Sequence, residues 1–156
     1  RERRARVGGV EELLGAFGDR WVVGRRRGLR RFGDGVIEER EFEGVASSVS
    51  RARSFAVAAS GADARTADVL RLVVSELATN AVLHAGSAFT VRVIRARDLL
   101  RVEIADHCVE LPTPRHHSPR AVTGRGLSIV EQMVARWGVI PEVWGKRVWF
   151  ELRPPA

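Results

Sequence analysis

The sequence predicts an α+β fold, a two-layer sandwich in which helices cover one face of a mostly antiparallel sheet. Two observations support this prediction. Apolar residues alternate in some segments and recur every three or four residues in others, in the order strand, helix, helix, hairpin, loop, helix, hairpin. The 156 residues are 45% hydrophobic and 29% charged, which is enough apolar material for one ordinary globular domain with a core.

Residues 1–35 are rich in Arg and Gly and are expected to form a basic arm that is flexible or loosely docked. They hold ten Arg against five acidic residues, so they carry +5 of the net charge of +7. The domain itself is expected at residues 36–153, where the charge is nearly balanced. A nucleic-acid-binding function is therefore not favoured for the domain, although a basic arm that binds nucleic acid is an alternative.

The first half of the domain is predicted to contain a strand followed by two helices. The alternation in VIEEREFEG, residues 36–44, predicts the strand. Apolar residues at helical spacing predict a helix over residues 45–60, which Gly61 ends. Asp63 is the expected N-cap of the second helix, which continues to Gly86.

The second half is predicted to contain two hairpins separated by a loop and a helix. FTVRVIRA and LLRVEIAD, residues 89–96 and 99–106, form the first hairpin around a turn at Asp98. Residues 107–124 include three prolines and are expected to form a long loop of the kind that often covers a binding site. A helix is expected over 124–138, followed by a pair of closing strands, VIPEV at 139–143 and KRVWFEL at 146–152.

The second helix carries polar residues beside its apolar stripe. A helix turns about 100° per residue, so Leu70, Val74 and Leu77 share one face, while Glu76 and Asn80 lie about 100° away from it. An anion and an amide on an apolar flank need polar partners. Either they bond to each other or to a neighbouring loop, or they line a pocket that holds a polar ligand or a hard cation. His84 lies nearer the apolar stripe, where a hydrogen-bonded structural role is expected.

Two later segments favour the pocket. Asp106 ends a predicted strand, where its carboxylate can accept hydrogen bonds, although a turn-forming role is an alternative. Gly124 and Gly126 immediately precede a predicted helix, where glycine lets the backbone approach a ligand and the helix start offers N–H groups to an anion. A lone GxG usually marks only a turn, but the ordered set of motifs is far more specific.

Together these motifs resemble the GHKL ATPase superfamily, and most closely its small anti-sigma-factor type, the serine-kinase-like regulators common in actinobacteria. SELATNAVLHAG, residues 75–86, is similar to that group's N-box. LLRVEIAD leads into a segment similar to the first glycine box, and GRGLSIVEQMVARWG is similar to the second. KRVWFEL is similar to the closing strand. The resemblance covers residues 36–152 and implies a GHKL (Bergerat) fold.

Position by position, the resemblance implies roles for the motif residues. Glu76 is expected to act as the general base or to orient the attacking hydroxyl, and Asn80 to ligate Mg²⁺. Asp106 is expected to accept a hydrogen bond from the adenine amino group. The other expected nucleotide contacts are Gly124, Arg125, Gly126 and Leu127 through their backbones, with His84 and Lys146 as weaker candidates. Lys146 is alternatively a simple hairpin residue.

One position departs from the superfamily pattern. The first glycine box usually contains Asp-x-Gly, but here Asp106 and His107 are followed by Cys108. The missing glycine affects the expected adenine contacts and nucleotide affinity. Cys108 is interpreted as a small filler rather than as a reactive thiol.

The resemblance implies an ATP-binding regulator that uses Mg²⁺ and phosphorylates a serine of a partner, an anti-sigma-factor antagonist, so that a sigma factor and transcription are controlled. One alternative is a nucleotide-dependent protein-binding module without phosphotransfer. Another is the ATPase-like domain of a larger regulator. A homodimer is a further expectation. One cysteine and no apolar run near the ~20 residues of a membrane span favour the cytoplasm.

Overall fold

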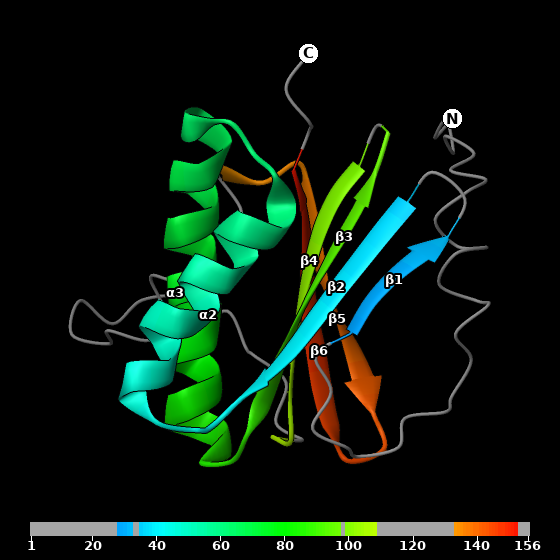
Figure 1. The fold of residues 1–156 in the computed structure, drawn as a ribbon. Coiled ribbons are helices and arrows are strands. Elements are labelled where there is room, and N and C mark those ends of the chain that lie inside the picture. The colour runs from blue at the N-terminus through cyan, green and yellow to red at the C-terminus, as the bar shows by residue number, and fades with distance from the viewer. Residues whose placement is uncertain (1–27, 33–34, 98, 109–132, 153–156) are drawn as a thin grey trace, which may run out of the picture.

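The computed structural model describes residues 28–32, 35–97, 99–108 and 133–152. In these residues six strands form one antiparallel sheet in the order β1-β2-β3-β4-β6-β5, and two helices lie on one of its faces (Figure 1). The predicted two-layer α+β class is thus confirmed. The elements are β1 Gly28–Phe32, β2 Gly35–Phe42, α2 Ala46–Ser60, α3 Ala64–Ala85, β3 Phe89–Ala96, β4 Leu99–Asp106, β5 Arg136–Glu142 and β6 Gly145–Leu152.

Both helices begin and end within one residue of the predicted positions. The Oδ1 atom of Asp63 caps α3 by accepting a hydrogen bond from the N–H of Thr66 at 2.8 Å. Hydrogen bonds from Thr66, first from its side chain and then from its backbone, lower the pKa of the Asp63 carboxyl. Gly61 and Gly86 follow the two helices, each with a φ of 59°, a conformation that glycine adopts at low cost.

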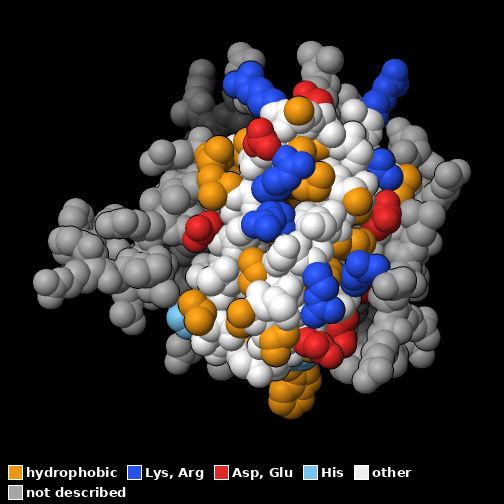
Figure 2. Space-filling model, turned by 60° about the vertical axis from the view of Figure 1, so that its left-hand side comes forward, with side chains coloured by type: hydrophobic (Ala, Val, Ile, Leu, Met, Phe, Trp, Pro, Cys, Tyr) orange, Lys and Arg blue, Asp and Glu red, His pale blue; other side chains and the backbone are white. Residues whose placement is uncertain are grey.

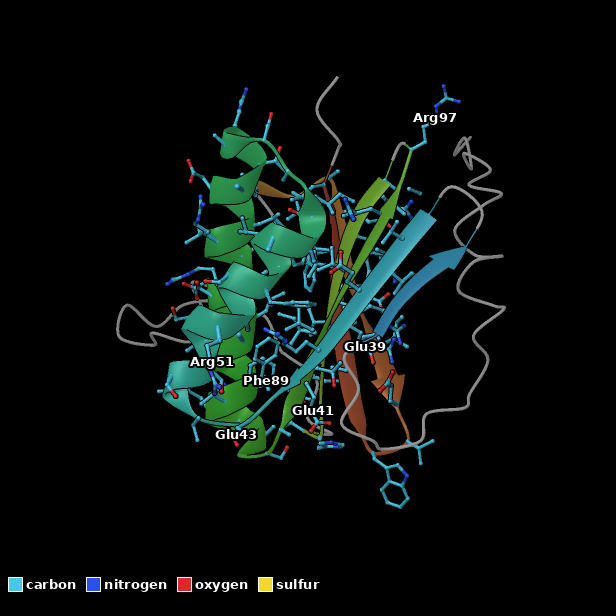
Figure 3. All side chains as sticks on the ribbon, in the orientation of Figure 1. Glu39, Glu41, Glu43, Arg51, Phe89 and Arg97 are labelled. Atoms are coloured by element: carbon cyan, nitrogen blue, oxygen red, sulfur yellow. The ribbon has the colours of Figure 1, made fainter. Side chains whose placement is uncertain are left out.

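The core fills the space between the helices and one sheet face. The predicted stripe of α3 is buried, and Phe89 of β3 lies against the helices, as Figure 3 shows. Phe89 also stacks on Phe42 of β2, with ring centroids 5.6 Å apart. The main strand and α3 residues of the core are Phe42, Leu70, Val73, Val74, Leu77, Ala81, Phe89, Val91, Val93, Leu100, Val102, Ile104, Val148, Phe150 and Leu152.

The helix predicted over 124–138 is wrong at its C-terminal end. Residues from Arg136 onward belong to β5, where Trp137 pairs with Phe150 and Gly138 with Trp149. A Cβ atom on Gly138 would lie 2.8 Å from the Trp149 ring, so glycine permits this close approach. The pairing with β6 therefore overrides the local helical pattern. β5 lies at an edge of the sheet and contains Pro141.

Strand β1 lies N-terminal to the boundary expected at residue 36. Its residues Gly28–Phe32 pair with β2 at the other edge of the sheet, from Gly28 opposite Glu39 to Phe32 opposite Gly35. The end of the expected arm thus adds a strand to the sheet. Residues 1–27 lie outside the described residues, so the basic arm stays a prediction.

The sheet face that points away from the helices carries a network of ion pairs. At its centre, Glu103 of β4 accepts hydrogen bonds from Arg101 at 2.9 Å, from Arg147 at 2.9 Å and from Arg92 at 3.3 Å. Only 2% of the Glu103 side chain is exposed. A buried carboxylate is costly unless it is paired, so the burial of Glu103 depends on these three guanidinium groups.

Further contacts extend this network across β4, β5 and β6. Arg101 donates to Glu151 at 3.1 Å and lies 4.1 Å from the ring centroid of Trp149, and Arg147 donates to Glu142 at 2.8 Å. Burial is the largest single effect on the pKa of Arg147 and lowers it, but the two carboxylates that it contacts together raise it above its ordinary value. Arg147 therefore remains a cation within the network.

The turn between β5 and β6 packs tightly against the end of β4. A Cβ atom on Gly145 would overlap the backbone carbonyl oxygen of Asp106 and would lie 2.8 Å from the Cα atom of His107. Backbone atoms cannot move aside as a flexible side chain can. A glycine at position 145 is therefore required for β6 to begin beside Asp106.

Glu103 and Glu142 both contact Arg147, but the network predicts that the loss of Glu103 lowers the free energy of unfolding much more. Glu103→Gln is expected to lower the free energy of unfolding by about 3–5 kcal/mol, because it leaves buried cations without their shared anion. Glu142→Gln is the matched control, because the Glu142 side chain is 36% exposed, and a loss below about 1 kcal/mol is expected. Urea denaturation of both variants measures the difference, and equal losses would contradict a central role for Glu103.

The close packing around Gly145 predicts that an added Cβ atom there lowers the free energy of unfolding more than one that only strains the backbone conformation. Gly145→Ala is expected to lower the free energy of unfolding by roughly 3 kcal/mol, near the upper end for overpacking, because backbone must shift. In Gly86→Ala the added Cβ atom would meet no atom within 4 Å and pays only for a positive φ, about 1–2 kcal/mol. Thermal and urea denaturation compare the two variants. A Gly145→Ala variant as stable as Gly86→Ala would show that the turn has room to move.

Candidate functional site

Glu76 and Asn80 lie one turn apart on the flank of α3, and both are half-buried. They do not bond to each other, and no described residue forms a hydrogen bond or an ion pair with either side chain. Both side chains are partly exposed, so they can bond to water or to a ligand. Among the described residues, the geometry excludes mutual pairing of these two side chains and leaves both able to contact a ligand.

His84 does not occupy the structural position expected from the sequence. Its side chain is exposed in the last turn of α3, whereas the buried stripe of the helix ends at Ala81. His84 lies near the angle of the apolar stripe round the helix, but the core does not extend along the helix as far as His84. An exposed imidazole in the last turn of the helix is accessible to a ligand.

Asp106 ends β4 and is paired with Lys146 of β6. Their Cα atoms are register partners, and Nζ of Lys146 lies 3.1 Å from Oδ1 of Asp106. Both side chains are buried and continue the row of core residues on the helix side of the sheet. Two charges at the end of an apolar core thus neutralise each other.

Asp106 and Lys146 also form hydrogen bonds with the backbone of Cys108, two residues further on. The N–H of Cys108 donates to Oδ1 of Asp106 at 2.8 Å, which closes a turn of the type that Asp side chains often form. Nζ of Lys146 also donates to the carbonyl oxygen of Cys108 at 3.3 Å. Cys108 is partly buried in this turn. The position that is usually glycine in the first glycine box is therefore held by side-chain hydrogen bonds.

The fold brings the flank of α3 and Asp106 to the same end of the molecule. Three residues link α3 to β3, which begins at Phe89, and Thr90 of β3 lies opposite Ala105 of β4. Asp106 therefore lies beside the C-terminal end of α3. Asn80 is five residues from that end, about 7.5 Å along the helix axis. Figure 1 shows this end at the bottom, where α3, the start of β3 and the β5–β6 turn lie.

Outside the described residues lie the remaining predicted contacts, Gly124, Arg125, Gly126 and Leu127, and most of the loop predicted over 107–124. Sequence reasoning proposed Lys146 as a nucleotide contact but missed its ion pair with Asp106. The sequence shows only opposite charges at the ends of two predicted strands, and the pairing of β4 with β6 in the structure makes them partners.

The described residues offer one side chain, Asn80, that is suited to hold Mg²⁺. No three His, Cys, Asp or Glu side chains of this part of the chain group together as a metal site. The amide oxygen of Asn80, without a partner among the described residues, is a suitable hard ligand. Mg²⁺ typically takes one or two protein ligands and completes its shell with water and phosphate oxygens, which fits such a site.

The helix side of the molecule carries a mixed surface. Figure 2 shows basic, acidic and apolar side chains interspersed over it. Arg71 pairs with Asp68 at 2.7 Å, and Arg51 lies 3.9 Å from Glu43. A continuous basic patch, the usual footprint of a nucleic-acid-binding surface, is not present on this face of the described residues. Neither described helix combines the length and apolar character that a membrane crossing requires.

Comparison with solved structures gives a partial likeness. The histidine kinase domain of the blue-light activated histidine kinase from Erythrobacter litoralis EL346 is 22% identical, with a TM-score of 0.44. The match covers 68% of this chain and 59% of that one, so this chain spans less than two thirds of the length of that domain. A search of curated proteins finds no match.

A comparison with models of protein families gives a match over most of the chain. The model of the histidine kinase-like ATPase domain matches residues 42–151. This range runs from the end of β2 almost to the end of β6 and contains Glu76, Asn80, Asp106 and Lys146. Because the match covers most of the chain and every described site residue, this chain belongs to the family of histidine kinase-like ATPase domains.

Proposed function

We propose that this ATP-binding domain is an anti-sigma-factor-like regulator that phosphorylates a serine of a partner antagonist protein. The observation that carries the proposal is the pair of half-buried side chains Glu76 and Asn80, which have no partner among the described residues and lie in the C-terminal half of α3, the half that ends beside Asp106. The Glu76 carboxylate can act as a general base, and the Asn80 amide oxygen can ligate a metal ion. The Asp106 carboxylate can accept a hydrogen bond from a nucleobase.

Phosphoryl transfer needs little covalent work from the protein, because positioning and charge stabilisation supply most of the catalysis. In the proposed site Asn80 holds Mg²⁺, and Glu76 orients or deprotonates the attacking serine hydroxyl. Bound Mg²⁺ supplies neutralisation of phosphate charge. Asp106 accepts a hydrogen bond from the base of ATP. Glu76 and Asn80 are two positions of one helix, so their spacing is fixed before a ligand binds.

A specific observation favours the second candidate, a nucleotide-dependent binding module without phosphotransfer. No described residue forms a hydrogen bond with Glu76, whereas a catalytic base is usually oriented by another group. The segment similar to the second glycine box, which both candidate functions would use to hold the nucleotide, lies outside the described residues. The proposed protein partners are an antagonist or a sigma factor, in the cytoplasm, and the chain is proposed to act as a homodimer or as the ATPase-like domain of a larger regulator.

The proposal predicts micromolar, Mg²⁺-dependent ATP binding, about −8 kcal/mol at 1 μM. Asn80→Ala is expected to weaken Mg-ATP binding at least about tenfold, because it removes a metal ligand, and to change binding in EDTA much less. Thr79→Ala, at the exposed neighbouring position, is the matched control and should bind like the parent. Calorimetry measures all three proteins. Absence of heat and of thermal stabilisation at millimolar Mg-ATP would refute nucleotide binding.

A second prediction separates the kinase from the binding module. Glu76→Gln is expected to keep the helix and ATP binding, because Glu and Gln have similar shape and helix propensity. It should slow phosphate transfer to the antagonist by about two to four orders of magnitude, the usual scale for the loss of a general base. Transfer from labelled ATP to candidate antagonists and one denaturation curve per variant are the measurements. Transfer by Glu76→Gln at the parental rate, or none by the parent, would leave only the binding module.

A further inference from the structure

Lys146 is a buried cation with two specific acceptors. Its side chain is only 8% exposed, and Nζ donates to Oδ1 of Asp106 at 3.1 Å and to the carbonyl oxygen of Cys108 at 3.3 Å. A lysine is rarely buried unless its charge is paired. These contacts turn the ammonium group toward the end of β4 and the turn that follows it.

The two oxygen atoms of Asp106 have different surroundings. Oδ1 accepts two hydrogen bonds, from Lys146 and from the N–H of Cys108. Oδ2 accepts none from the described residues. Nε of Arg95 is the one side-chain atom of the described part that is both fully buried and unpartnered, so Oδ2 retains some exposed surface although the Asp106 side chain is only 5% exposed. Rotation of the carboxylate would break both bonds to Oδ1, which leaves Oδ2 presented in one direction.

We propose that Lys146 is a positioning residue for recognition of the nucleobase. It holds Oδ1 of Asp106 so that Oδ2 accepts a hydrogen bond from the exocyclic amino group of a 6-aminopurine. An ionised carboxylate only accepts hydrogen bonds, so it suits the 6-amino donor of adenine and opposes the 6-oxo acceptor of guanine. This inference rests on the proposed function, because it assumes that a nucleotide binds at this end of the fold.

The bond from Lys146 to Cys108 gives the lysine a second part in the same task. Cys108 stands where the first glycine box usually has glycine, and its N–H is one of the two donors to Oδ1. By holding the Cys108 carbonyl, Lys146 fixes the turn that aims this N–H at Asp106. This indirect role replaces the direct nucleotide contact expected from the sequence, because two of the three ammonium donors already bond to the protein.

The test compares two nucleotides that differ only in the amino group. ATP and purine riboside triphosphate, which lacks the 6-amino group, are titrated with Mg²⁺ into the full chain by calorimetry. The parent is expected to bind ATP about tenfold to a hundredfold more tightly, the range of one hydrogen bond to a charged acceptor. Lys146→Met should lose most of this preference through weaker ATP binding, while its affinity for the analogue stays within about twofold of the parent.

Controls separate positioning from a structural role. Arg97→Met removes a charge at the exposed turn between β3 and β4, at the opposite end of the sheet (Figure 3), and should leave both affinities unchanged. If Lys146→Met does not fold, Lys146→Gln, which keeps a neutral donor, carries the same comparison and should show a partial loss of preference.

The outcomes are distinguishable. An equal fall in affinity for both nucleotides, or a parent that binds both equally, overturns the positioning role but leaves nucleotide binding in place. A parent that binds neither nucleotide at millimolar concentration overturns the proposed function, and the positioning role with it.

Discussion

The pairing of β4 with β6 determines most of this structure. The two strands are about forty residues apart in sequence, yet they pair from Leu100 opposite Leu152 to Asp106 opposite Lys146. Because side chains alternate across a strand, one register places Val102 and Phe150 in the core and Glu103 in the ion-pair network. A slip by one residue would bury the charges against the helices and expose the core, so the register is strongly specified.

The same register places the strand residues of the candidate site. The core ends with a charged pair where β4 and β6 end, and α3 ends beside this pair, so the C-terminal half of α3, with Glu76 and Asn80, approaches that end of the molecule. The site residues are carried by a helix and by strand ends rather than by long loops, which preserves their spacing. The charges on the outer face and those at the site are separated by the sheet itself, since they lie on opposite faces. The ion-pair network therefore lies on the opposite face of the sheet from the candidate site.

Local signals in the sequence predicted the helices, their caps and the first hairpin, because glycine stops, an Asp cap and clean periodicity all act over a few residues. Predictions that required long-range information were weaker. The residues around Arg136 have a helical pattern, and the partner strand that makes them part of β5 lies ten residues or more further on. The angle of His84 round the helix predicts a place near the core, although the depth of the core along α3 is set by the sheet. The Asp106–Lys146 pair depends on which strands become neighbours, which periodicity alone does not specify.

One edge of the sheet has a consequence for self-assembly. β5 has β6 on one side only, so its outer edge is the place where a strand from another molecule could add. Pro141 has no backbone N–H to donate, and proline is tolerated in a strand where its nitrogen faces away from the partner strand. The outer edge of β5 is thereby deprived of a donor close to the hairpin turn. A strand from a second copy of this chain would find no backbone N–H at Pro141, so this edge offers one hydrogen bond fewer to such a strand near the turn.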